Sequence, residues 1–142
     1  NGAILEGMHF LCAEDNELNA EILTELLKMK GAECTICENG QKVVETFEQS
    51  VPGAYDMILM DVQMPVMNGY DAARAIRRSL HKQAGTIPII AMTANAFSED
   101  IRHSLTAGMN AHISKPVDMM LLEKTIRSIK SGGGSETQAD KE

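Results

Sequence analysis

The stretch MILMDVQMPVMNG, residues 57–69, decides the fold. It opens with four apolar residues, the length of a short buried strand, and Asp61 follows them directly. Pro65 and Gly69 then favour a loop over a longer strand. A strand that is apolar throughout, with no alternation of polar residues, is typical of a parallel sheet covered by helices on both faces.

The same organisation continues on both sides of this stretch. Apolar runs of strand length occur at residues 8–13, 34–37, 57–60, 87–92 and 111–114. Segments with helical spacing follow each run. In the first of these we expect a core stripe of Leu18, Ile22, Leu26 and Met29, and in the third one of Ala73, Ile76 and Leu80. The pattern predicts an α/β fold of five successive strand–helix units around a parallel sheet.

The length of 142 residues and the 44% hydrophobic content suit one globular domain. We expect this domain over residues 8–130, after an N-terminal extension or remnant at residues 1–7 and before a flexible polar tail or linker at residues 131–142. The chain has no initiating Met, which suggests a processed chain or a piece of a longer one. No apolar run reaches the roughly 18–20 residues of a membrane-spanning helix.

The net charge and the cysteines disfavour two further classes of function. The net charge of −7 argues against direct nucleic-acid binding, and Arg74, Arg77 and Arg78 are interpreted as a solvated helix face. Cys34 and Cys37 form a C-x-x-C pair, but residues three apart in a strand point to opposite faces, which disfavours a zinc or redox site. Reduced thiols fit a cytoplasmic protein.

Polar residues follow the predicted strands where each strand ends. Glu14 and Asp15 follow the first strand, Asp61 the third, Thr93 the fourth and Lys115 the fifth. In open α/β sheets the ligand site lies at the carboxyl ends of the strands, so these side chains should gather on one rim. Three carboxylates at close range repel one another, and a hard cation such as Mg²⁺ removes that conflict.

A carboxylate beside such an ion can act as a nucleophile towards phosphorus. Lys115 would then place a positive charge, and Thr93 a hydroxyl donor, against the oxygens of the transferring group. Each residue alone has a simpler interpretation as a cap, a loop side chain or a surface charge. Their shared position at strand ends, with complementary charges, favours the phosphoryl-transfer site.

Four motifs resemble the receiver domain of two-component response regulators. They are AEDN at residues 13–16, LMDVQMPVMNG at 59–69, MTA at 92–94 and SKP at 114–116, and the likeness spans about residues 8–130. The resemblance implies a flavodoxin-like fold with a five-stranded parallel sheet in the order 2-1-3-4-5, flanked by five helices. Among receivers, the chain is most similar to those of hybrid sensor histidine kinases and phosphorelays, because of the run EDNxxN at residues 14–19.

The resemblance also implies roles for single residues. Asp61 would be the phosphoacceptor, with Lys115 contacting the phosphoryl group through a strand end whose Lys115–Pro116 bond is cis. Mg²⁺, or Mn²⁺ in its place, would be held by Glu14, Asp15, Asp61 and the backbone carbonyl of Gln63. Thr93 and the residue three before the lysine would form the switch. Gln63 and Asn95 would tune the lifetime of the phosphate.

The switch position departs from the family pattern, because it holds His112 where Tyr or Phe is usual. His112 is either a partly exposed residue without a special role or a source of pH sensitivity. The implied partners are a histidine kinase or a histidine phosphotransfer domain that docks on the first helix, with phosphorylation-dependent self-association as a further expectation. Leu23 and Leu27 on that helix are either partner contacts or part of a broad core face.

Other functions remain as alternatives. A Mg²⁺-dependent phosphohydrolase like the haloacid dehalogenases would need a second Asp two residues after the nucleophile, where this chain has Gln63. A degenerate receiver could act as a scaffold without being phosphorylated. The preferred interpretation is a switch that catalyses only its own phosphorylation and dephosphorylation, either alone or as the cytoplasmic part of a membrane-anchored hybrid kinase.

Overall fold

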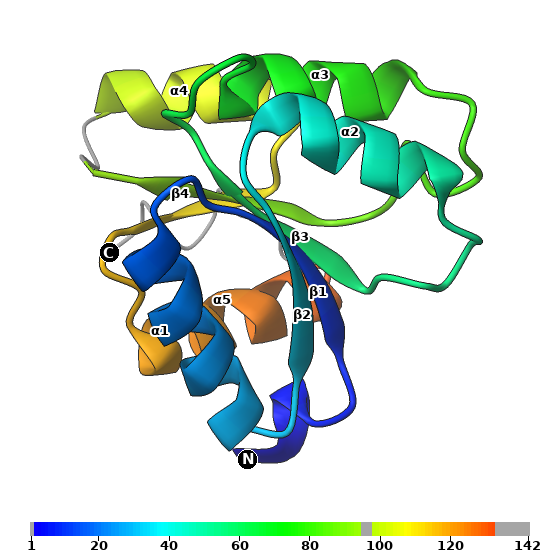
Figure 1. Cartoon of the computed structure of the whole chain (residues 1–142). Helices are drawn as coiled ribbons and strands as arrows, with labels where there is room; N and C mark the ends of the chain where they lie inside the picture. Colours follow the sequence, from blue (N-terminus) through cyan, green and yellow to red (C-terminus); the bar gives the residue numbers. More distant parts are fainter. Residues whose placement is uncertain (1, 95–97, 133–142) are drawn as a thin grey trace.

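The computed structural model describes residues 2–94 and 98–132 (Figure 1). Five parallel strands form one sheet in the order β2-β1-β3-β4-β5, which confirms the expected fold. The strands are β1 (His9–Ala13), β2 (Glu33–Cys37), β3 (Met57–Asp61), β4 (Ile89–Thr93) and β5 (Ala111–Ser114). The helices are η1 (Gly2–Leu5), α1 (Glu17–Met29), α2 (Gly40–Gln49), α3 (Gly69–Arg78), α4 (Ser98–Thr106) and α5 (Met119–Lys130).

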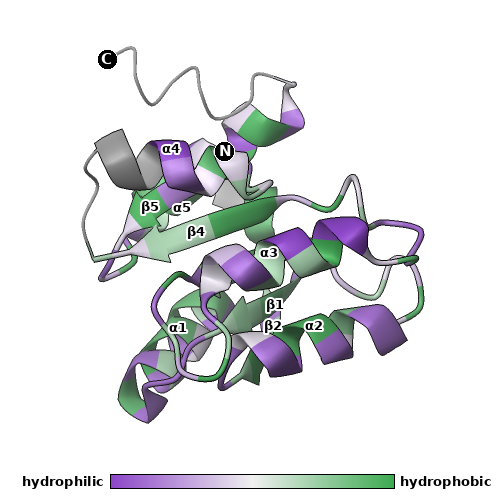
Figure 2. Cartoon of the chain, turned by 90° about the horizontal axis from the view of Figure 1, so that it is seen from above, coloured by the Kyte–Doolittle hydropathy of each residue, from purple (hydrophilic) through white to green (hydrophobic). Residues whose placement is uncertain are grey.

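The sheet divides the core into two halves. Helices α2, α3 and α4 cover one face, while α1 and α5 cover the other (Figure 1). β3 and β4 are buried along their whole length, as their continuous apolar sequence predicts. Figure 2 shows the strands in the hydrophobic colour at the centre, with hydrophilic residues along the outer sides of the helices.

Short polar caps determine where four of the helices begin. Asn16, Asn39 and Asn68 each accept a hydrogen bond from the backbone N–H three residues later, at 2.8–2.9 Å. Asp118 does the same for the N–H of Met120 at 2.9 Å. Such caps satisfy backbone donors that the first turn of a helix leaves unpaired. These four caps therefore mark the first turns of α1, α2, α3 and α5.

The buried face of α1 is not the one that we expect from the sequence. Leu27 is fully buried and Leu23 nearly so, whereas Leu18 is 64% exposed and Ile22 50% exposed. The two stripes lie side by side on the helix and have the same spacing, so periodicity alone does not separate them. Leu23 and Leu27 are therefore core residues, and the predicted core stripe is mostly the outer surface of α1.

Two expectations for α3 are also wrong. Leu80 is fully exposed because α3 ends at Arg78 and Ser79 caps it. Arg77 is half-buried and not part of a solvated face. Its guanidinium donates to Gly108 O at 2.9 Å, to Ala84 O at 3.0 Å and to Asn110 Oδ1 at 2.9 Å, and burial lowers its pKa. Arg77 thus joins α3 to the turn between α4 and β5.

The N-terminal segment and the cysteines also have defined positions. Leu5 of η1 is fully buried in the α1/α5 half of the core, and Gly7 N–H donates to Gly31 O at 2.9 Å. Cys34 packs against that same half, whereas Cys37 lies in the other, so the C-x-x-C pair does not converge on one site. Among the described residues, no helix has the length and apolar character required to cross a membrane.

The two faces of α1 give a stability prediction. Leu27→Ala should lower the free energy of unfolding by about 2–4 kcal/mol, because it removes buried apolar volume and leaves a cavity. Leu18→Ala should change it by less than about 0.5 kcal/mol, as expected of a surface position. Urea unfolding followed by circular dichroism measures both values. Equal losses for the two variants would show that α1 is rotated relative to the arrangement described.

Candidate functional site

Three carboxylates meet where β1 and β3 end. Glu14 and Asp15 follow β1, and Asp61 is the last residue of β3. The two strands are hydrogen-bonded neighbours with Ala13 opposite Met60, so their ends lie side by side. One oxygen from each carboxylate lies within 4.8 Å of the others. Glu14 and Asp61 are buried and Asp15 is exposed, so the cluster opens to solvent on one side.

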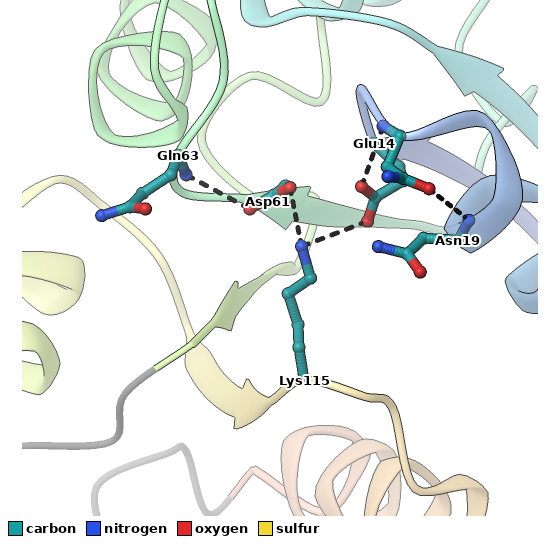
Figure 3. Close-up of polar contacts among 6 residues, drawn as sticks. Glu14, Asn19, Asp61, Gln63 and Lys115 are labelled. Atoms are coloured by element: carbon teal, nitrogen blue, oxygen red, sulfur yellow. Dashed lines mark hydrogen bonds and ion pairs between the residues drawn. The ribbon is translucent and has the colours of Figure 1, made fainter.

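Lys115 supplies the positive charge of the site (Figure 3). Its Nζ lies 3.0 Å from Asp61 Oδ2 and 3.4 Å from Glu14 Oε1. Burial of the ammonium is the largest single influence on its pKa and lowers it, but the hydrogen bonds and charges of Asp61 and Glu14 together outweigh burial and raise the pKa. One ammonium thus faces two buried carboxylates and remains charged.

Backbone groups orient these side chains. Gln63 N–H donates to Asp61 Oδ1 at 3.2 Å, and Asn16 N–H donates to Glu14 Oε2 at 3.2 Å. Lys115 N–H donates to Thr93 O at 2.8 Å, which ties the lysine to the end of β4. The Lys115–Pro116 peptide bond is cis, the isomer that the resemblance implies.

The carboxylates line an acid pocket of about 260 Å³. Its lining consists of Glu14, Asp15, Asn16, Asn19, Asp61, Gln63, Ala94 and Lys115. Three carboxylates against one ammonium leave an excess of negative charge, and all the acidic donors are hard oxygens. This donor set suits Mg²⁺ or Mn²⁺, which prefer carboxylate, carbonyl and water ligands. The expected metal-binding residues are therefore together, and their chemistry fits the ion.

The remaining predicted residues lie at different distances from this pocket. Gln63 is exposed at its edge. Thr93 is buried at the end of β4 and is not among the lining residues. His112 is half-buried on β5 and faces the α3/α4 side of the sheet, because its neighbours Ala111 and Ile113 belong to the opposite half of the core. Asn95 lies outside the described residues.

An apolar groove lies beside the acid pocket, and the sequence did not predict it. It has a volume of about 310 Å³. Its lining consists of Glu14, Asn19, Ile22, Leu23, Leu26, Met92, Lys115, Pro116 and Val117. Glu14, Asn19 and Lys115 also line the acid pocket, so the groove and the pocket are continuous. Asn19, the last residue of the EDNxxN run, was the available sequence signal for this groove.

The chain is similar to response regulator receiver domains and to parts of histidine kinases. The family model of the response regulator receiver domain matches residues 10–127. A probable histidine kinase 2 from Oryza sativa subsp. indica is 34% identical over 90% of this chain, and the match spans 13% of that protein. A hybrid signal transduction histidine kinase I from Dictyostelium discoideum is 37% identical over 83% of the chain, and the match spans 7% of that protein.

Solved structures show the same fold. The receiver domain of a sensor histidine kinase from Pseudomonas aeruginosa, with a magnesium ion in its active-site cleft, is 36% identical with a TM-score of 0.75, over 89% of this chain and 98% of that one. The receiver domain of Ssk1 from Saccharomyces cerevisiae, crystallised with the histidine phosphotransfer protein Ypd1, is 30% identical with a TM-score of 0.76, over 92% and 94%.

The acid cluster predicts a specific response to magnesium. Adding Mg²⁺ should raise the unfolding temperature of the wild type, because an ion that binds only the folded state stabilises it. Asp15→Asn should weaken Mg²⁺ binding on the order of tenfold, about 1.4 kcal/mol, because it removes one carboxylate ligand. Without metal the same variant should be at least as stable as the wild type, since fewer like charges repel one another.

Calorimetric titration and thermal unfolding measure these effects. Glu25→Gln, which neutralises an exposed carboxylate further along α1, is the matched control and should bind Mg²⁺ as the wild type does. Wild-type affinity in Asp15→Asn would remove this residue from the metal site.

Proposed function

Because the chain belongs to the response regulator receiver domain family, we propose that Asp61 accepts a phosphoryl group from a phosphohistidine and that its phosphorylation switches partner binding. The single observation that carries this proposal is the position of Lys115 Nζ between Asp61 and Glu14. That contact brings the carboxyl ends of β1, β3 and β5 to one point. The relatives are much longer than this chain, so its place within a hybrid histidine kinase is part of the proposal.

In the proposed reaction a carboxylate oxygen of Asp61 forms a bond to phosphorus while the bond from phosphorus to the donor imidazole nitrogen breaks. Bound Mg²⁺ would supply positive charge that offsets the carboxylates and the incoming phosphoryl group. Lys115, already paired with Asp61, is placed to follow the phosphoryl oxygens as negative charge moves onto them. The Gln63 backbone N–H orients the Asp61 carboxylate.

The residue at position 63 favours a switch over a hydrolase. A turnover phosphatase needs an acid that protonates its leaving group, and the exposed amide of Gln63 cannot serve as that acid. In the proposal, Gln63 and Asn95 affect how long the phosphate lasts, and decay rates of their variants test this role. Thr93 and His112 are the proposed switch pair, which amide chemical shifts before and after phosphorylation can follow.

The outer surface of α1 is the proposed docking site for a histidine phosphotransfer domain. Leu18 and Ile22 are exposed, and Ile22 lines the apolar groove that opens into the acid pocket. A partner seated on this surface could bring its phosphohistidine to Asp61. We also propose that this chain and its phosphotransfer partner are both cytoplasmic, since three free thiols suit a reducing compartment.

The phosphoacceptor assignment is tested by labelling. With Mg²⁺ and acetyl phosphate, the wild type should gain one phosphoryl group, and Asp61→Asn should gain none because the nucleophile is gone. Intact-mass spectrometry detects the adduct, and Asp71→Asn, an exposed aspartate of α3, is the control that should label normally. Equal labelling of wild type and Asp61→Asn would refute the assignment. No labelling of the wild type would favour an unphosphorylated scaffold.

The docking site is tested by comparing two phosphodonors. Ile22→Asp should reduce transfer from phosphorylated Ypd1 on the order of tenfold or more, because it puts a charge into an apolar contact. Its labelling by acetyl phosphate should remain close to the wild-type rate. Met29→Asp, exposed at the far end of α1, is the matched control and should transfer normally. If Ile22→Asp and wild type accept phosphate from Ypd1 equally well, the docking surface lies elsewhere.

A further inference from the structure

The turn between β2 and α2, residues 37–40, contributes no side chain to the acid pocket, but its backbone contacts the loop after β1 and the loop after β3. Glu14 N–H donates to Cys37 O at 3.0 Å, which joins the turn to the loop after β1. Gly40 N–H donates to Met67 O at 3.1 Å, which joins the turn to the loop after β3. We call this segment the β2–α2 brace, because its backbone is hydrogen-bonded to the loop that carries Glu14 and to the loop after β3, which begins directly after Asp61.

Gly40 allows this close approach because it has no side chain. A Cβ at position 40 would lie 2.3 Å from Met67 O and 3.0 Å from Met67 C, which are backbone atoms. Asn39, nearly buried, caps α2 through the N–H of Lys42 and holds the brace in place. Any larger residue at position 40 would therefore have to displace the loop after β3, by roughly 1 Å to reach ordinary contact distance.

The loop after β3 is itself under conformational constraint. Met67 N–H donates to Pro65 O at 2.6 Å, and Val66 between them has φ +67°, the signature of a γ-turn that is rare and strained for a β-branched residue. Beyond Met67, Gly69 is equally tight, since a Cβ there would lie 2.4 Å from Asp61 O. The loop is thus held near its C-terminal end by close contacts at both Gly40 and Gly69.

We propose that Gly40 is a positioning residue for the metal-binding acid site, acting through Met67 and the loop after β3. The inference rests on the proposed function, because it assumes that the acid cluster binds Mg²⁺. Mutual repulsion of the carboxylates tends to separate Glu14, on the loop after β1, from Asp61 at the end of β3. Gln63, on the loop after β3, holds the Asp61 carboxylate through its backbone N–H. The β2–α2 brace opposes that separation because it is bonded to the loop of Glu14 and, at Met67, to the loop that carries Gln63. Displacing it changes the spacing of the oxygen ligands, although no ligand is altered.

The test is Gly40→Ala, with Mg²⁺ affinity measured by calorimetry. We expect the affinity to fall about 10- to 100-fold, the range seen when groups that orient metal ligands are lost. In the metal-free variant, the backbone amide shifts of Gln63 and Met67 should change, because the loop moves before any ion binds.

Two glycine controls separate positioning from a general loss of stability. A Cβ at Gly108 would lie 2.8 Å from Arg77 Cγ, and Gly108 has φ +99°, so Gly108→Ala should destabilise the fold without touching the loop after β1 or the loop after β3. At Gly85 nothing lies within 4 Å of an added Cβ. Both control variants should keep wild-type Mg²⁺ affinity while folded. Asn39→Ala loosens the brace without a steric clash and should weaken Mg²⁺ binding severalfold. It serves as the test variant if Gly40→Ala does not fold.

The outcomes distinguish the brace from the proposed function. Wild-type Mg²⁺ affinity in a folded Gly40→Ala, or in Asn39→Ala when Gly40→Ala does not fold, would overturn the positioning role. An equal loss of affinity in Gly108→Ala would also overturn it, because the effect would then follow stability alone. A wild type that neither binds Mg²⁺ nor is labelled at Asp61 would instead contradict the proposed function.

Discussion

The mutual repulsion of three carboxylates is the constraint on which the rest of this structure depends. Glu14, Asp15 and Asp61 are held within reach of one ion, and among the described residues Lys115 alone forms an ion pair with them. Unrestrained acidic side chains would move apart, so the loops that carry them must be fixed by the fold. The parallel sheet does this by ending adjacent strands at one edge, and the backbone bonds from the β2–α2 brace to Glu14 and to Met67 restrain the loops after β1 and β3. Without a cation the carboxylates of this site repel one another, and this repulsion favours the binding of a cation.

Much of this arrangement could be predicted from sequence because its causes are local. Continuous apolar runs identified the strands. The polar residues that follow these runs were predicted to lie at the carboxyl edge of the sheet. The rule that parallel strands end at the same edge then brought Glu14, Asp15, Asp61 and Lys115 together. The order of the strands came from the resemblance, since periodicity carries no information on which strands are neighbours.

The parts that could not be predicted depend on contacts between distant segments. Apolar spacing on α1 defines two adjacent stripes, but only packing against the sheet decides that Leu23 and Leu27 point inwards. The end of α3 left Leu80 in solvent, and two of the three oxygen partners of Arg77, Gly108 O and Asn110 Oδ1, lie 31 and 33 residues further along the chain. The apolar groove is likewise made by α1 and the segment after β5 together, so no single motif describes it.

The division of α1 into an inner and an outer face has a consequence for how such domains diverge. Leu27 is tied to the core, so its replacement is penalised in every lineage that must fold. Leu18 and Ile22 are exposed and contribute little to the stability of the fold, so folding alone does not fix their identity. With the proposed docking site on this face, substitutions there after a gene duplication would change partner choice while the core and the acid site are inherited unchanged. Insulation between pathways can then evolve on one helix face at little cost in stability.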